Sequence, residues 1–177
     1  MAVIRPARLS DAAALAALAE RTFRETFAAD NSEENVNLHC AGKFSAEIQR
    51  GEISDPQMST LLAEVAGELV GFAQLRWAHG AACVKGDRPA ELNRIYVANA
   101  WHGRGIANEL MRAVYAAAAR AGCECIWLGV WERNPRAIAF YRKCGFSVVG
   151  DHVFMLGQDQ QRDLILAAQV DSLLPGA

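Results

Sequence analysis

The sequence His102–Ala107 is a short glycine-containing turn that separates a strand-like run from a helix-like run. Before the turn, Glu91–Val97 is rich in β-forming residues. After it, apolar residues recur through Ile106–Ala121 with the 3.6-residue period of an amphipathic helix. The chain must therefore pass from a strand directly into the first turn of a helix at Gly103 and Gly105.

A helix N-terminus of this kind is suited to binding phosphate. The first backbone amides of a helix have no partner within it, and the helix dipole adds partial positive charge there. Gly103 and Gly105 have no Cβ atoms that would keep a ligand from the backbone, and Arg104 adds a full positive charge. The turn is therefore predicted to bind the phosphates of a ligand.

Two common phosphate-binding loops do not fit this stretch. A dinucleotide-binding fingerprint needs a third glycine where this chain has Asn108, and an acidic residue that ends the next strand, whereas Glu124 precedes that strand. A P-loop needs Gly-Lys followed by Ser or Thr, and Gly42-Lys43 is followed by Phe44. The turn therefore belongs to another class of phosphate site.

The turn resembles the acyl-CoA loop of the GNAT N-acetyltransferases, whose pattern is Gln/Arg-x-x-Gly-x-Gly/Ala. Gly105 and Ala107 occupy the two small positions, and His102 replaces the first Gln or Arg, a position that works largely through its backbone amide. The resemblance implies that acetyl-CoA is the co-substrate. The residues that it assigns to the cofactor around the turn are Tyr96, Val97, His102, Gly103, Arg104, Gly105, Ile106 and Ala107.

A second motif, Asn134–Phe146, resembles the GNAT signature Asn-x-x-Ala-x-x-Phe-Tyr-x-x-x-Gly-Phe and matches it at every fixed position. The resemblance implies that Asn134 contacts the pantetheine arm and that Tyr141 faces the coenzyme sulfur. A phenol can protonate a departing thiolate at neutral pH, so Tyr141 is the candidate catalytic acid. Without the resemblance, Tyr141 would be interpreted as an aromatic residue of the core.

Glu91 is the candidate base for the amine that accepts the acetyl group. It lies on the strand that enters the turn, at the spacing before His102 that the base has in histone-type members of the family. A partly desolvated carboxylate beside an ammonium can act directly or through one water. The alternatives are that Glu91 only binds substrate charge or pairs with Arg94. A backbone amide near Val97 and Ala98 is expected to stabilise the oxyanion.

The remaining patterns predict strands mixed with helices in a single domain, residues 1–177. The expected fold is α+β, with a GNAT-like, mostly antiparallel sheet of about seven strands, a parallel middle pair and about four flanking helices. Between the first helix and Pro56 the chain is polar, with two weak helical pieces beginning near Ser32 and Ser45. This segment is interpreted either as a flap over the substrate or as a surface loop.

The amino-acid composition limits the classes of partner that the protein is expected to bind. The net charge is −2 with no basic cluster, so neither nucleic acid nor a membrane surface is expected as a partner. Five cysteines without paired zinc-site spacing indicate a reduced, cytoplasmic protein without a metal. A small-molecule amine is the expected substrate, and a homodimer stays open as the oligomeric state.

The acceptor is suggested by a narrower resemblance to bacterial spermidine/spermine N-acetyltransferases. The segments that carry it are Glu91–Val97, Trp127–Glu132, His152–Gly157 and Gln161-x-Asp163. A polyamine is therefore the first interpretation, with Asp30, Glu33 and Glu34 supplying negative charge along its path. The alternatives are a protein N-terminus, a lysine or an amino-acid-like acceptor, and a non-catalytic acyl-CoA-binding module.

Overall fold

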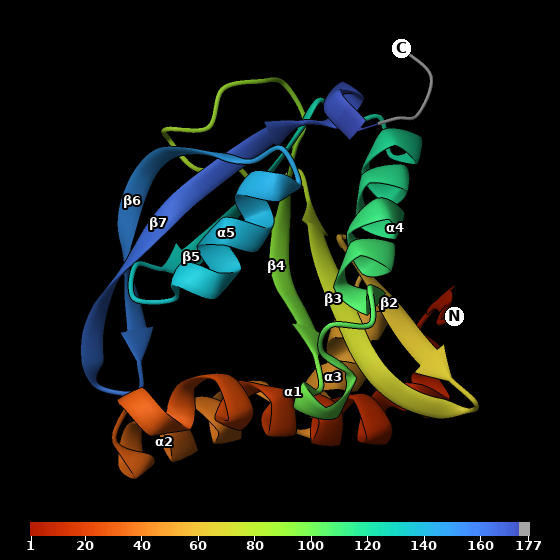
Figure 1. The fold of residues 1–177 in the computed structure, drawn as a ribbon, viewed down its shortest axis with the longest axis vertical. Helices are drawn as coiled ribbons and strands as arrows, with labels where there is room; N and C mark the ends of the chain where they lie inside the picture. The colour runs from red at the N-terminus through yellow and green to blue at the C-terminus, as the bar shows by residue number, and fades with distance from the viewer. Residues whose placement is uncertain (174–177) are drawn as a thin grey trace.

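The computed structural model describes residues 1–173 as a mixed sheet with helices on both faces (Figure 1). The strands are β1 (Val3–Pro6), β2 (Met58–Val65), β3 (Glu68–Trp77), β4 (Pro89–Val97), β5 (Cys125–Trp131), β6 (Ser147–Leu156) and β7 (Asp159–Gln169). The helices are α1 (Ala12–Phe27), α2 (Glu33–Lys43), α3 (Ala46–Ser54), α4 (Ile106–Arg120) and α5 (Pro135–Lys143). None of these helices has the length and apolar composition needed to cross a membrane.

The expected fold class is confirmed. The seven strands lie in the order β1-β2-β3-β4-β5-β7-β6, and every neighbouring pair is antiparallel except β4 and β5. Five α-helices flank the sheet, one more than the approximate count from the sequence, because the polar segment after α1 holds two helices. Ser32 and Ser45 cap them: the Asn35 amide donates to Ser32 Oγ at 3.3 Å and the Ile48 amide to Ser45 Oγ at 3.1 Å.

The middle strands of the sheet are covered on both faces. On one face, α4 and α5 cover them with a core that includes Leu110, Val114 and Ile126. On the other face, α1 packs through Leu15 and Phe23 against β3, while α3 lies against β2 and α2 against β6. In Figure 1, α4 and α5 stand in front of the sheet, and α1 and α2 run below it.

The helix α5 is capped at both ends. Asn134 Oδ1 accepts a hydrogen bond from the Ala137 amide at 3.1 Å, and Gly145 has a φ of +91°, the left-handed conformation that favours glycine after a helix. The chain then folds back, so that the Phe146 ring lies edge-on to Tyr141 with centroids 5.9 Å apart. These contacts fix the position of Tyr141 on the helix.

The parallel pair at the centre of the sheet is short. β4 and β5 are paired only from Pro89 opposite Cys125 to Glu91 opposite Trp127, after which they diverge, as Figure 1 shows. A bulge lies just beyond the last pair, because the register of β4 against β3 shifts at Asn93. Since a bulge increases local twist, it turns the rest of β4 away from β5 and leaves a gap in the sheet.

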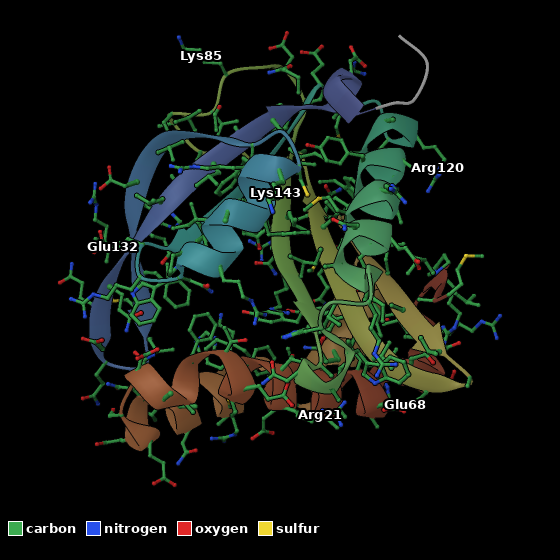
Figure 2. All side chains as sticks on the ribbon, in the orientation of Figure 1. Arg21, Glu68, Lys85, Arg120, Glu132 and Lys143 are labelled. Atoms are coloured by element: carbon green, nitrogen blue, oxygen red, sulfur yellow. The ribbon has the colours of Figure 1, made fainter. Side chains whose placement is uncertain are left out.

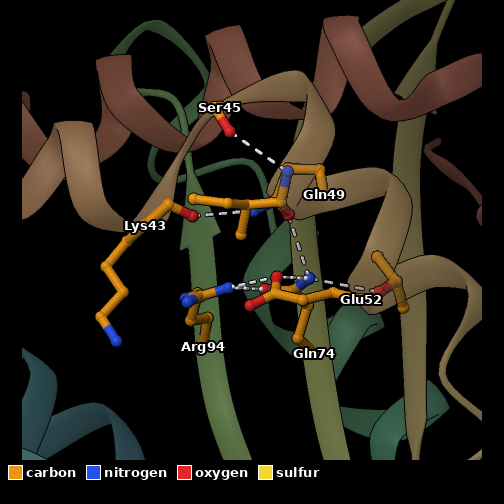
Figure 3. A network of polar contacts seen from close by, with 8 residues as sticks. Lys43, Ser45, Gln49, Glu52, Gln74 and Arg94 are labelled. Atoms are coloured by element: carbon orange, nitrogen blue, oxygen red, sulfur yellow. Dashed lines mark hydrogen bonds and ion pairs between the residues drawn. The ribbon is translucent and has the colours of Figure 1, made fainter.

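A buried polar network attaches α3 to the sheet (Figure 3). Gln49 and Gln74 are fully buried, and Gln74 Nε2 donates to Gln49 Oε1 at 3.2 Å. Arg94 donates to Glu52 Oε2 at 2.7 Å and to Gln74 Oε1 at 2.6 Å. The Gln49 amide group also donates to the Lys43 carbonyl at 3.0 Å. The network therefore links α2, α3, β3 and β4 through side chains that are largely removed from water.

Glu52→Ala tests this network. It leaves the Arg94 guanidinium without its anionic partner in a site where the Arg94 side chain is 12% exposed, and we expect a loss of about 1.5–3 kcal/mol in the free energy of unfolding. Glu20→Ala is the control, because Glu20 forms an exposed ion pair with Arg24 on α1 and should cost no more than about 0.5 kcal/mol. Urea unfolding measures both, and equal losses would contradict the network's role.

Candidate active site

The glycine turn is open toward solvent. Gly103 and Gly105 have φ angles of +76° and +81°, and a Cβ added at either would meet no described atom within 4 Å. The first backbone hydrogen bond into α4 runs from the Glu109 amide to the Gly105 carbonyl at 3.1 Å. The amides of residues 106–108 therefore lie before the helical ladder and have no partner within the helix. This is the arrangement that a phosphate site requires.

His102 joins the turn to the end of β4 and the start of α5. Its Nε2 lies 2.7 Å from the Val97 carbonyl, which can only accept, so Nε2 carries the proton; Nδ1 accepts from Arg136 at 3.2 Å. The His102 amide donates to the Asn99 carbonyl at 3.1 Å. The backbone amide that the family pattern assigns to the cofactor is thus used inside the turn, and the His102 side chain holds the end of β4 instead.

Two tyrosines lie beside the gap. Tyr96 comes from β4 and Tyr141 from α5. Burial raises the pKa of both phenols, so both stay protonated at neutral pH. The Ala98 amide is bonded to the Val70 carbonyl at 2.9 Å. Because successive amides of a strand point to opposite edges, the Val97 amide faces the gap.

Glu91 is paired with an arginine, but not with Arg94. Its carboxylate accepts from Arg76 at 3.2 Å and lies 3.6 Å from His79 Nε2. Arg76 is directly opposite Glu91 in the β3–β4 register, whereas Arg94 is bound to Glu52 on α3. The pairing with Arg94 that the sequence left open is therefore wrong. Sequence spacing alone could not give the register that brings Arg76 to Glu91.

Two buried side-chain atoms have no hydrogen-bond partner among the side chains that the structure describes, Asn93 Nδ2 and Asp163 Oδ1. Asn93 lies at the β4 bulge, and Asp163 lies on β7, which pairs with β5. Asp163 is 7% exposed, and burial raises its pKa to about 6. No sequence motif pointed to a functional role for Asp163. The one sequence feature that could have indicated it is a single carboxylate just before the apolar run Leu164–Ala168.

A hollow of about 700 Å³ is lined by Trp131, His152 and Arg162, which are neighbours of Asp163 in the sheet or along the chain. Trp131, whose ring centroid is 6.0 Å from that of Phe27, forms part of its wall. The charged and titratable residues that line the hollow are Asp30, Glu132, Arg133, Asp151, His152, Asp159 and Arg162. Asp30 lies at the wall of this hollow. Glu33 and Glu34 line a separate depression on α2, because they point away from the sheet.

The comparisons with known proteins agree with this geometry. The model of the "Acetyltransferase (GNAT) family" matches residues 13–146. The chain belongs to the GNAT family. An uncharacterised N-acetyltransferase of Mycobacterium bovis is 33% identical to this GNAT protein over 92% of this chain and 99% of the relative. Another, from Lactobacillus delbrueckii subsp. lactis, is 30% identical over 85% and 87%.

A similar solved structure contains coenzyme A and so identifies the cofactor. The PaiA N-acetyltransferase of Thermoplasma acidophilum in complex with coenzyme A has a TM-score of 0.79 and 25% identity, covering 96% of this chain and 99% of that one. The present GNAT protein is therefore an acyltransferase, an N-acetyltransferase that uses acetyl-CoA. Its glycine turn has the open amides and left-handed glycines that fit the pyrophosphate of the coenzyme.

Gly105→Asp tests the turn. The substitution places a carboxylate where the pyrophosphate is expected, and we predict a more than tenfold loss of acetyl-CoA affinity by calorimetric titration, a change of about 1.4 kcal/mol or more. Gly67→Asp is a matched control, because Gly67 in the β2–β3 hairpin has a φ of +82° and equally open surroundings. Both variants carry the same backbone strain, so an equal effect on affinity would remove the turn from the cofactor site.

Proposed function

We propose that the acceptor is a small amine with more than one positive charge, of the polyamine class, and that it attacks acetyl-CoA directly. The observation that carries this proposal is the charge of the hollow. Four carboxylates and two guanidinium groups line it. Arg162 is already bound to Asp151 at 2.9 Å and to Glu132 at 3.1 Å. The excess of carboxylates favours a ligand that brings positive charge.

The hollow also offers an aromatic contact for an ammonium group. The indole of Trp131 lines it, and cations bind over aromatic faces with modest favourable energy. An amino-acid-like acceptor would bring a carboxylate of its own, which would compete with Asp151 and Glu132 for Arg162. A polyamine brings no such group, so the charges favour it over an amino acid.

The proposed chemistry assigns one step to each group at the gap. The neutral amine nitrogen attacks the thioester carbonyl carbon, and the Val97 amide stabilises the oxyanion that forms. When the carbon–sulfur bond breaks, the Tyr141 hydroxyl gives its proton to the thiolate and recovers one from the new amide nitrogen. Glu91, held by Arg76, contributes negative charge that attracts the cationic acceptor.

An amine panel tests the acceptor. With free-thiol release as the readout, spermidine and spermine should be acetylated with higher kcat/KM than monoamines, amino acids or peptides. Added salt should raise the KM for a polyamine, because the carboxylates of the hollow are partly exposed. A panel in which neutral-tailed amines or peptides react faster than spermidine would contradict the polyamine assignment.

Tyr141→Phe tests the catalytic acid. The substitution keeps the ring against Phe146 and removes only the hydroxyl, so kcat should fall about 10²- to 10⁴-fold with little change in acetyl-CoA affinity. Tyr115→Phe is the control, because that buried hydroxyl donates to the Cys144 carbonyl at 2.8 Å and should cost about 1 kcal/mol of stability but no chemistry. A Tyr141→Phe enzyme within twofold of the wild-type kcat, with chemistry limiting, would make Tyr141 a packing residue.

A further inference from the structure

Asp163 lies next to a histidine, on the side of the sheet that carries the hollow. In register, it is opposite Trp131 of β5 on one side and His152 of β6 on the other. His152 Nε2 is 3.9 Å from Asp163 Oδ2. Both side chains cover Gly129: a Cβ there would lie 3.0 Å from His152 Nε2 and 3.3 Å from Asp163 Oδ2. Glycine at 129 therefore makes room for the carboxylate and the imidazole.

Asp163 lies at the open end of the gap, whereas Glu91 lies at the closed end. Glu91 is level with Trp127, the last β5 residue paired with β4, and Asp163 is level with Trp131. At the rise of a strand, the two levels are about 13 Å apart. Asp163 is therefore paired with the part of β5 that has already diverged from β4, next to the gap.

Glu91 and Asp163 differ in their ability to accept a proton. A base needs a free lone pair and a pKa near the working pH. The Glu91 carboxylate already accepts a hydrogen bond from Arg76 at 3.2 Å. Asp163 Oδ1 has no partner among the described side chains, and burial, opposed only by the charge of His152, raises the Asp163 pKa to about 6.

His152 connects this buried carboxylate to water. Its side chain is 40% exposed and lines the hollow, while its Nε2 approaches Asp163 at a distance that one water molecule can bridge. A proton received by Asp163 thus has a titratable group between it and solvent, and imidazole is the side chain best suited to pass a proton near neutral pH.

We propose that Asp163 is the base that takes the proton from the acceptor ammonium and that His152 passes this proton to solvent. The inference rests on the proposed direct attack by a protonated amine. The ammonium N–H bond breaks and Asp163 gains the proton, which leaves the nitrogen lone pair free to form the bond to the acetyl carbon. Asp163 then returns to its carboxylate form through His152.

The groups around Asp163 fix the expected pH dependence. His152 faces it from β6, while Gly129 and Trp131 of β5 carry no charge. On the α2 side, burial lowers the pKa of His39 to about 4, so His39 is neutral at the working pH. Below a pH of about 6, Asp163 is protonated and cannot accept a proton. The kcat/KM of the free enzyme should therefore fall on the acidic side of pH 6.

Asp163→Asn tests the base with two acceptors. With the amine of the panel that reacts best and is protonated at pH 7, kcat should fall about 10²- to 10⁴-fold. The decrease of kcat/KM below a pH of about 6 should disappear in this variant. With trifluoroethylamine, which is already neutral at pH 7, the loss should be less than about tenfold, because no base is needed. Glu68→Gln, at the exposed β2–β3 hairpin far from Glu132 and the hollow (Figure 2), is the control and should leave both rates unchanged.

Equal losses with both acceptors would assign Asp163 to structure or binding and overturn the proposal. The proposal would also be overturned if the decrease of kcat/KM at low pH persisted in Asp163→Asn and disappeared in Glu91→Gln. The polyamine assignment is separate, because the test uses whichever amine reacts best. His152→Ala gives a second measurement that leaves Asp163 in place: the rate should fall and be restored by added imidazole, and a lack of rescue would overturn the role of His152.

Discussion

The active site of this GNAT protein depends on the separation of β4 from β5. The two strands are paired over three residues and then diverge, so peptide groups in the middle of a sheet face a gap and not a neighbouring strand. Buried peptide groups require hydrogen-bond partners, and a cofactor with amides of its own can supply them. The bulge at Asn93 and the short pairing thus create the place where the coenzyme arm can lie, and α4 begins where β4 delivers the chain to the phosphate turn.

The gap also gives the two carboxylates of the acceptor side different environments. Glu91, at its closed end, is held by Arg76, whereas Asp163, at its open end, is buried against His152. Burial raises the pKa of the Asp163 carboxyl group, whose Oδ1 has no partner among the described side chains, whereas the Glu91 carboxylate accepts from Arg76. Pairs of titratable groups with such contrasting surroundings divide the roles of charge and proton transfer. This contrast leads us to separate attraction of the acceptor by Glu91 from its deprotonation by Asp163.

Local chemistry made much of the fold predictable. Several features of the fold depend only on short segments of sequence, and the structure has each of them. They are the serine and asparagine caps, the glycines with positive φ and the apolar period of α4. What could not be predicted depends on contacts between distant segments. Arg76 meets Glu91 only through the strand register, and the burial of Asp163 requires β6, β7 and the missing Cβ of Gly129. No short segment of the sequence therefore pointed to Asp163 as a base, whereas Tyr141, the candidate acid, lies within a recognisable motif.

His102 shows how a departure from a family pattern can be structural. The ring bonds to the Val97 carbonyl, on the gap side of β4, and accepts from Arg136 at the start of α5. It thereby connects the end of β4 to α5 at the level of the phosphate turn. It also holds the Arg136 guanidinium beside that turn, where Arg104 already lies over the Trp101 ring at 4.8 Å. Two cations at an open helix N-terminus attract the phosphates of the coenzyme more strongly than the amides alone. The side chain at position 102 thus positions one of these cations through its contact with Arg136.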